Sequence, residues 1–171
     1  MLKPQDIVLA FHLVQGELLS QHEMAVKVGL SQPEVSNALK RLKASRLLLA
    51  DARSIVAPHL IELCVHGVKY FFPPVMGHRT GGVPTVTLAD PLKGKVAGED
   101  MDLVWPAPRG PARANSLEPI HACAVAAAQN DERVYRLLVL LDGIRVGKSR
   151  IRSMSEELLT AQIQGGARAA R

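Results

Sequence analysis

Residues 143–149 combine glycine, lysine and serine in an order that could bind phosphate. Loops that wrap a phosphate have four residues between their two glycines, so that successive N–H groups surround the anion. Only three residues separate Gly143 from Gly147, and the position required for the first glycine is held by Asp142, whose carboxylate would repel a phosphate. The segment therefore predicts a helix end followed by a basic joint, and not a nucleotide site.

Zinc binding is a second candidate chemistry, because Cys64 with His66 and His121 with Cys123 are ligand types for that ion. Residues two apart on a helix diverge by about 200°, so each pair would have to lie where its helix ends. Buried thiols with hydrogen-bonded histidines are the simpler interpretation. We expect no metal or other cofactor. Since no nucleophile is paired with a base in a convincing context, we also expect no enzymatic activity and no catalytic residue.

The composition excludes several classes of protein. The chain has 171 residues, a formal net charge of +5 and two cysteines, too few for a disulfide scaffold. The apolar run 122–128 is far shorter than the about 18 residues that cross a bilayer, and the first residues lack the pattern of a secretory signal. We expect a cytoplasmic globular protein with no membrane contact. The basic excess lies in residues 1–70 and 131–171.

Two helix-start signals mark the N-terminal region. Ser20 and Ser31 are each followed three residues later by glutamate, the capping box in which both side chains satisfy backbone N–H groups. Gly29 predicts the left-handed end of the first short helix. With a helix beginning near Pro4 and another over 32–44, this is the order of a helix-turn-helix.

The predicted helix over 32–44 has an apolar inward face and a polar outward face. Short amides, hydroxyls and cations on the outward face suit base edges in a major groove. We expect base contacts from five residues: Gln32, Pro33, Ser36, Asn37 and Lys40. We expect contacts to the DNA backbone from five others: Ser31, Arg41, Lys43, Arg46 and Arg53.

Residues 47–50 and 54–57 are compatible with a short two-stranded wing that has Arg53 near its tip. Over residues 4–58, this layout resembles winged helix-turn-helix transcriptional regulators of the MarR or ArsR kind. The resemblance implies sequence-specific binding of double-stranded DNA by a regulator, most simply a repressor. A homodimer is expected, because one such module usually contacts one half-site. The residues alone leave one alternative, a solvated amphipathic helix followed by an ordinary hairpin.

Helix-breaking residues divide the rest of the chain. Eight of the 11 prolines lie between Pro73 and Pro119, which predicts an extended connector that could carry short strands, such as 83–88. A helix from Pro58 to about Tyr70 is apolar nearly all round and is expected to be buried. We therefore expect a mostly helical α+β chain in four parts: a winged helix-turn-helix over 1–72, the connector over 73–116, a helical dimerisation or partner-binding segment over 117–163, and a disordered tail over 164–171.

Three short motifs suggest an alternative function. Residues 82–85, 104–106 and 137–148 resemble segments of small bacterial winged-helix proteins encoded beside nucleotidyltransferase-like toxins. This resemblance implies an antitoxin-type interaction protein that binds a toxin through its C-terminal helices and regulates its own operon. The basic joint over 145–152 could be a solvated face, a DNA or dimer contact, or a contact to such a partner.

Overall fold

The first helix begins at Pro4 as expected, and the predicted caps lie at both ends of the second helix and at the start of the third. The computed structural model describes residues 1–51, 54–96, 98 and 101–169. Helix α1 spans Pro4–Leu13, α2 spans Gln21–Val28 and α3 spans Gln32–Ala44. Both capping boxes are formed, and Gly29 ends α2 in the left-handed region with a φ of 73°.

A short hairpin follows α3. Leu48 and Ile55 form an isolated antiparallel bridge. The Leu49 N–H donates to the Ser54 carbonyl, and the Val56 N–H donates to the Leu47 carbonyl, each at 2.9 Å. The hairpin lies where the wing is expected, and Arg53 lies outside the described residues.

A continuous helical stretch comes next, formed by α4 (Ala57–Glu62), the π-helical η1 (Leu63–Gly67) and α5 (Val68–Phe71). It packs against α7 and α8. The sequence predicts burial nearly all round, but only one side is fully buried, through Leu60, Cys64 and Val68. These residues are four apart and so share one helical face.

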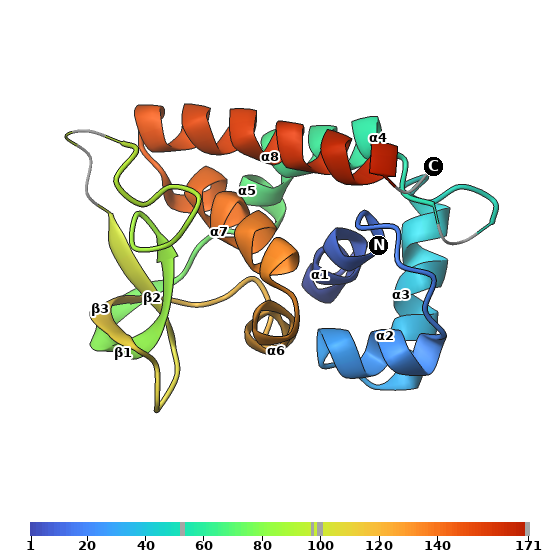
Figure 1. The fold of residues 1–171 in the computed structure, drawn as a ribbon, viewed down its shortest axis with the longest axis horizontal. Helices are drawn as coiled ribbons and strands as arrows, with labels where there is room; N and C mark the ends of the chain where they lie inside the picture. The colour runs from blue at the N-terminus through green and yellow to red at the C-terminus, as the bar shows by residue number, and fades with distance from the viewer. Residues whose placement is uncertain (52–53, 97, 99–100, 170–171) are drawn as a thin grey trace.

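The proline-rich middle segment forms a small sheet where the sequence predicts a connector. Strand β1 (Met76–Val86) pairs antiparallel with both β2 (Asp102–Pro106) and β3 (Ala112–Leu117). Two parallel pairs between β2 and β3 close the sheet on itself. The closed sheet lies at one end of the molecule, as Figure 1 shows.

Three helices complete the chain: α6 (Cys123–Asn130), α7 (Glu132–Val146) and α8 (Ser149–Ala169). The side chain of Asp131 accepts a hydrogen bond from the Arg133 N–H at 2.9 Å and so caps α7. Helix α8 continues past the position where the sequence predicts a disordered tail. It does so because Ile163 is fully buried and Ala167 packs against the core.

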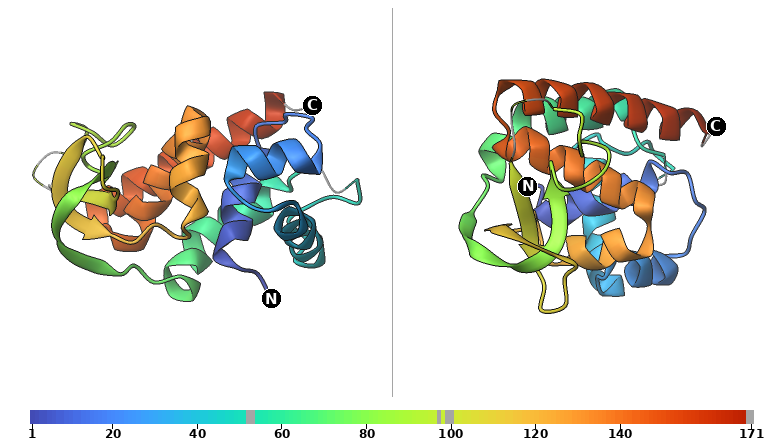
Figure 2. Two further views of the ribbon diagram at one scale, coloured as in Figure 1. Left: turned by 90° about the horizontal axis from the view of Figure 1, so that it is seen from below. Right: turned by 60° about the vertical axis from the view of Figure 1, so that its left-hand side comes forward.

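Helix α1 is the centre of the structure. Its residues from Asp6 onward are buried, because α2, α3, α6 and α7 all pack around it. Figures 1 and 2 show α3 at one end of the molecule and the sheet at the other, with α1 and α7 between them. One hydrophobic cluster runs from α1 to α8, so the N-terminal, middle and C-terminal segments share a single core.

The prediction of a mainly helical α+β chain is confirmed at this level. Within the described residues, no helix has both the length and the apolar character needed to cross a bilayer.

Candidate nucleic-acid interface

The outward face of α3 is open to solvent. Four of the five residues expected to contact bases are exposed: Gln32, Pro33, Asn37 and Lys40. The fifth, Ser36, is half-buried. In the part of the chain that the structure describes, the side chains of Asn37 and Lys40 bond to no other residue. Their polar groups are therefore available to a ligand.

The opposite face of α3 is fully buried. Val35, Ala38 and Leu42 have no exposed surface and pack toward α1 and α2. This burial sets which face of the helix points outward. Figure 1 shows α3 at the edge of the molecule, on the side away from the sheet.

The capping box fixes the N-terminus of α3. The Glu34 carboxylate accepts hydrogen bonds from the Ser31 hydroxyl at 2.6 Å and from the Ser31 backbone N–H at 2.9 Å. The hydroxyl, followed by the backbone N–H, lowers the pKa of Glu34. The Ser31 hydroxyl, which the sequence predicts to contact the DNA backbone, is thus engaged within the cap.

Arg41 ties α3 to α1. Its Nε donates to Asp6 Oδ2 at 2.8 Å and its Nη2 donates to Asp6 Oδ1 at 2.6 Å, while the Asp6 carboxylate is completely buried. Asp6 Oδ2 also accepts the Lys3 backbone N–H at 2.8 Å. The bond to Asp6 raises the pKa of Arg41. Two donors of this expected phosphate-binding residue are therefore occupied inside the protein.

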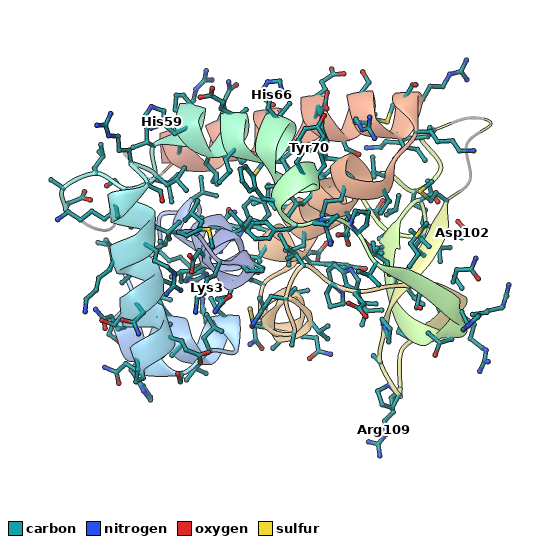
Figure 3. The ribbon with its side chains drawn as sticks, turned by 180° about the vertical axis from the view of Figure 1, so that it is seen from behind. Lys3, His59, His66, Tyr70, Asp102 and Arg109 are labelled. Carbon is teal, nitrogen blue, oxygen red and sulfur yellow. The ribbon has the colours of Figure 1, made fainter. Side chains whose placement is uncertain are left out.

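Lys43 and Arg46 are exposed at the C-terminal end of α3. The Lys43 Nζ lies 3.4 Å from the Ala50 carbonyl in the hairpin. The backbone of Arg46 is anchored, because its carbonyl accepts a hydrogen bond from His59 Nδ1 at 2.8 Å. Figure 3 shows His59 beside this end of α3. Both cations thus remain next to the hairpin, as expected of backbone contacts.

The described residues contain no arrangement suited to a metal ion. Cys64 and Cys123 are buried free thiols. Burial raises the pKa of Cys64, and it raises the pKa of Cys123 to about 12. Gly143 lies inside α7, so the segment that resembled a phosphate-binding loop is a helix end.

The three motifs of the C-terminal part meet at one buried carboxylate. Asp142 accepts hydrogen bonds from Thr85 Oγ1 at 2.9 Å, Trp105 Nε1 at 2.7 Å and Arg145 Nη1 at 2.8 Å. The Arg145 Nε donates to the Phe72 carbonyl at 3.0 Å. All four side chains are buried, so this cluster is a structural joint between the sheet and α7 with no access for a substrate.

The sequence contained one signal for this joint. Asp142 is a lone carboxylate directly after the apolar run 137–141, and a buried carboxylate needs a partner. Its partners Thr85 and Trp105 are far away in sequence, so their identity could not be read from local spacing.

The apolar stripe of α7 is used within the chain. Residues 137–141 are all buried against neighbouring elements, which leaves no apolar face of α7 for a second protein. Large exposed apolar side chains gather instead where α5 leads into β1: Tyr70, Phe71, Val75 and Met76. Tyr70 is 75% exposed and Phe71 is 73% exposed.

The basic joint divides into different environments. Arg145 is buried in the Asp142 cluster, Lys148 and Arg150 are exposed, and Arg152 is half-buried. The joint is therefore not one continuous cationic surface.

No family model, no curated protein and no solved structure matches this chain. Its function must be argued from its own geometry.

Proposed function

We propose that this protein is a sequence-specific DNA-binding transcriptional regulator that inserts α3 into the major groove of a duplex. The observation that carries the proposal is the outer face of α3, where exposed amides and a cation stand free on a helix whose other side is buried. Amides bond adenine with two hydrogen bonds, and lysine reaches the acceptors of guanine.

The surrounding elements support this assignment. Helices α1, α2 and α3 followed by a hairpin have the order of a winged helix-turn-helix, with a left-handed glycine in the turn. In such motifs the N-terminal part of the second helix approaches the base edges. Gln32, Pro33, Ser36 and Asn37 lie in the first half of α3, and Lys40 lies about one turn further along the helix. All five are assigned to base contacts.

Fewer residues are assigned to contacts with the DNA backbone than the sequence predicts. Lys43 and Arg46 are exposed and border the hairpin, so they are assigned to phosphates, together with Arg53, which is outside the described residues. We assign Arg41 to positioning, because Asp6 holds two of its donors. Ser31 acts through the cap of α3.

A homodimer would double this contact set, and its interface would be the exposed apolar group at Tyr70, Phe71, Val75 and Met76. An antitoxin-type partner would compete for the same surface. Light scattering of the purified protein distinguishes the two, because a homodimer forms without any other chain.

Selection from random duplexes, with excess competitor DNA present, tests the main proposal. The full-length protein should enrich one sequence family, and it should bind DNA from upstream of its own gene if that DNA contains the sequence. The substitution Asn37→Ala should broaden the enriched family. A selection in which no sequence is preferred would contradict the proposal.

A further inference from the structure

The ladder between β1 and β3 carries arginines on its outer face. Arg79 pairs with Asn115, and Gly81 pairs with Arg113. Directly paired residues of antiparallel strands point to the same side, and alternate residues share that side. Arg79 and Arg113 therefore lie on one face as diagonal neighbours, which places their β-carbons about 7–8 Å apart or slightly less.

The exposure of these side chains shows that this face of the ladder points to solvent. Arg79, Arg113 and Asn115 are exposed, whereas Ala114, on the alternate face, is buried. Gly81 stands opposite Arg113 and has no side chain to cover it. The exposed face of this ladder thus presents guanidinium groups and an amide, with no carboxylate among its paired residues.

A third arginine, Arg109, lies on the tip that joins β2 to β3, next to the Gly82 end of this ladder. The Gly110 N–H donates to the Ala107 carbonyl at 3.0 Å, which closes a turn with Pro108 and Arg109 at its centre. Gly110 packs against the backbone of Gly82 so closely that a β-carbon would overlap it. Figure 3 shows Arg109 at the far end of this projecting tip.

Two features restrict the tip. Pro108 fixes its own φ angle, and the close contact of Gly110 with Gly82 holds the turn against β1. A guanidinium on a turn restricted in this way loses less backbone freedom when it binds a ligand. We call Arg79, Arg109 and Arg113 the arginine ribbon.

Within the described residues, the arginine ribbon differs from four other arginines, whose guanidinium groups are held by carboxylates. Arg41, Arg133, Arg136 and Arg145 each bind a carboxylate. Among the described residues, none forms a hydrogen bond or an ion pair with a guanidinium of the ribbon. Asp102 lies at the opposite end of β2 from the tip, as Figure 3 shows.

We propose that the arginine ribbon is a second DNA-binding surface, which contacts duplex phosphates without regard to sequence. Planar guanidinium groups match phosphate oxygens in a two-bond geometry. Arg79 and Arg113 on the sheet and Arg109 on its tip offer three such contacts at one end of the molecule, and α3 lies at the other end (Figure 1). This surface goes beyond the proposed role of α3 and does not require it.

The test measures binding of the full-length protein to a duplex of unrelated sequence over a series of salt concentrations. Each phosphate contact contributes about 0.9 to the slope of log affinity against log salt. The variant R79Q/R109Q/R113Q should lower that slope by about 2.7, so that the affinity lost between 50 and 200 mM salt becomes about 40-fold smaller.

A matched control removes three other exposed cations, in K93Q/K95Q/R136Q. Lys93 and Lys95 lie in the loop between β1 and β2, at the opposite end of the sheet from the tip. This variant loses the same charge and should change the slope by less than about 0.9, the value of one contact. Thermal unfolding of both variants verifies that each is folded.

Equal slopes for the ribbon variant and the control would overturn the proposal and would favour an acidic protein as the ligand of the ribbon. The Asn37→Ala variant separates this result from a failure at α3. If only the ribbon proposal is wrong, sequence preference persists and depends on Asn37. If only the α3 proposal is wrong, preference is absent but the ribbon variant still lowers the slope.

Discussion

The indole Nε1 of Trp105 donates a hydrogen bond to the carboxylate of Asp142 at 2.7 Å. Trp105 is on β2 and Asp142 is on α7, so this bond joins the sheet to the helical core. Trp105 is also the only tryptophan in the chain. Its fluorescence therefore reports on this joint without any label.

Replacement of Asp142 by asparagine should destabilise the protein by about 3–5 kcal/mol, because it leaves the buried Arg145 without a counter-charge. Urea unfolding followed by Trp105 fluorescence gives the free energy. The control is Glu132→Gln, which removes the exposed ion pair with Arg136 on the same helix and should cost below about 0.5 kcal/mol. An equal loss of unfolding free energy in the two variants would show that the Asp142 cluster does not stabilise the protein more than an exposed ion pair does.

Asn37 and Lys43 should differ in how they affect DNA binding. Asn37→Ala should reduce discrimination at one base pair by about 1–3 kcal/mol, since the amide is assigned to a base edge. Lys43→Ala should weaken binding to every sequence alike and lower the salt slope by about 0.9. Titration of the preferred duplex and its single-base variants measures both effects. The same sequence-independent loss from both substitutions would show that the roles are wrongly assigned.

Arg41→Lys keeps the positive charge of α3 but cannot form both hydrogen bonds to Asp6. We expect a loss of stability of about 1.5–3 kcal/mol, the usual value of hydrogen bonds to a charged group. The exposed Arg46, changed to lysine, is the control and should leave the free energy of unfolding unchanged. If Arg41 were mainly a phosphate contact, Arg41→Lys would lower DNA affinity while stability stayed at the wild-type value.

His12 predicts a dependence of stability on pH. It is buried on α1, its Nε2 has no hydrogen-bond partner among the described residues, and burial lowers its pKa. The unfolded chain takes up a proton on this histidine near pH 6.5, and the folded chain does so only at lower pH. The contribution of His12 to the free energy of unfolding is therefore fully present above about pH 6.5, and it is lost as the pH falls toward the lowered pKa.

His12→Leu removes the titrating group and the unsatisfied nitrogen together. Its free energy of unfolding should vary less between pH 7 and pH 5 than that of the wild type, and at pH 7 it should equal or exceed the wild-type value. His22 is exposed on α2, so His22→Leu should retain the wild-type pH dependence. Denaturant unfolding across this range makes the comparison, and an unchanged pH slope in His12→Leu would contradict the assignment.

Gly143 allows α7 and α8 to pack closely. A β-carbon at this position would overlap the Ser155 hydroxyl, so Gly143→Ala should cost about 1–3 kcal/mol. The double variant G143A/S155G should recover part of that loss. Gly165 on α8 has open space around it, and Gly165→Ala should stabilise the helix by about 0.5–1 kcal/mol. Thermal unfolding of the three variants should give these opposite signs.

Local signals were sufficient for the N-terminal helices. The serine–glutamate caps and Gly29 predicted the start and end of α2, the turn and the start of α3, because a cap is satisfied by residues only three apart. The outward face of α3 followed from its helical period. Whether that face binds DNA is not decided by the pattern and stays a prediction.

Long-range pairings could not be predicted in the same way. Asp6 and Arg41 are 35 residues apart, and Thr85 and Asp142 are 57 apart, so no local period connects them. The sheet was underestimated for a related reason. The segment was predicted to carry only short strands because of its prolines. Pro84 and Pro106 are tolerated because each is paired on one side only, opposite Val104 and Gly82, and has no partner on the other side.

The central place of α1 limits how this protein can be dissected. A fragment that stopped at residue 72 would contain α1 but neither α6 nor α7, which cover its remaining sides. Without these two helices, α1 would expose several aliphatic side chains to water, and the fragment would aggregate or unfold. The part that carries α3 and the part that carries the sheet therefore depend on one shared core and fold together.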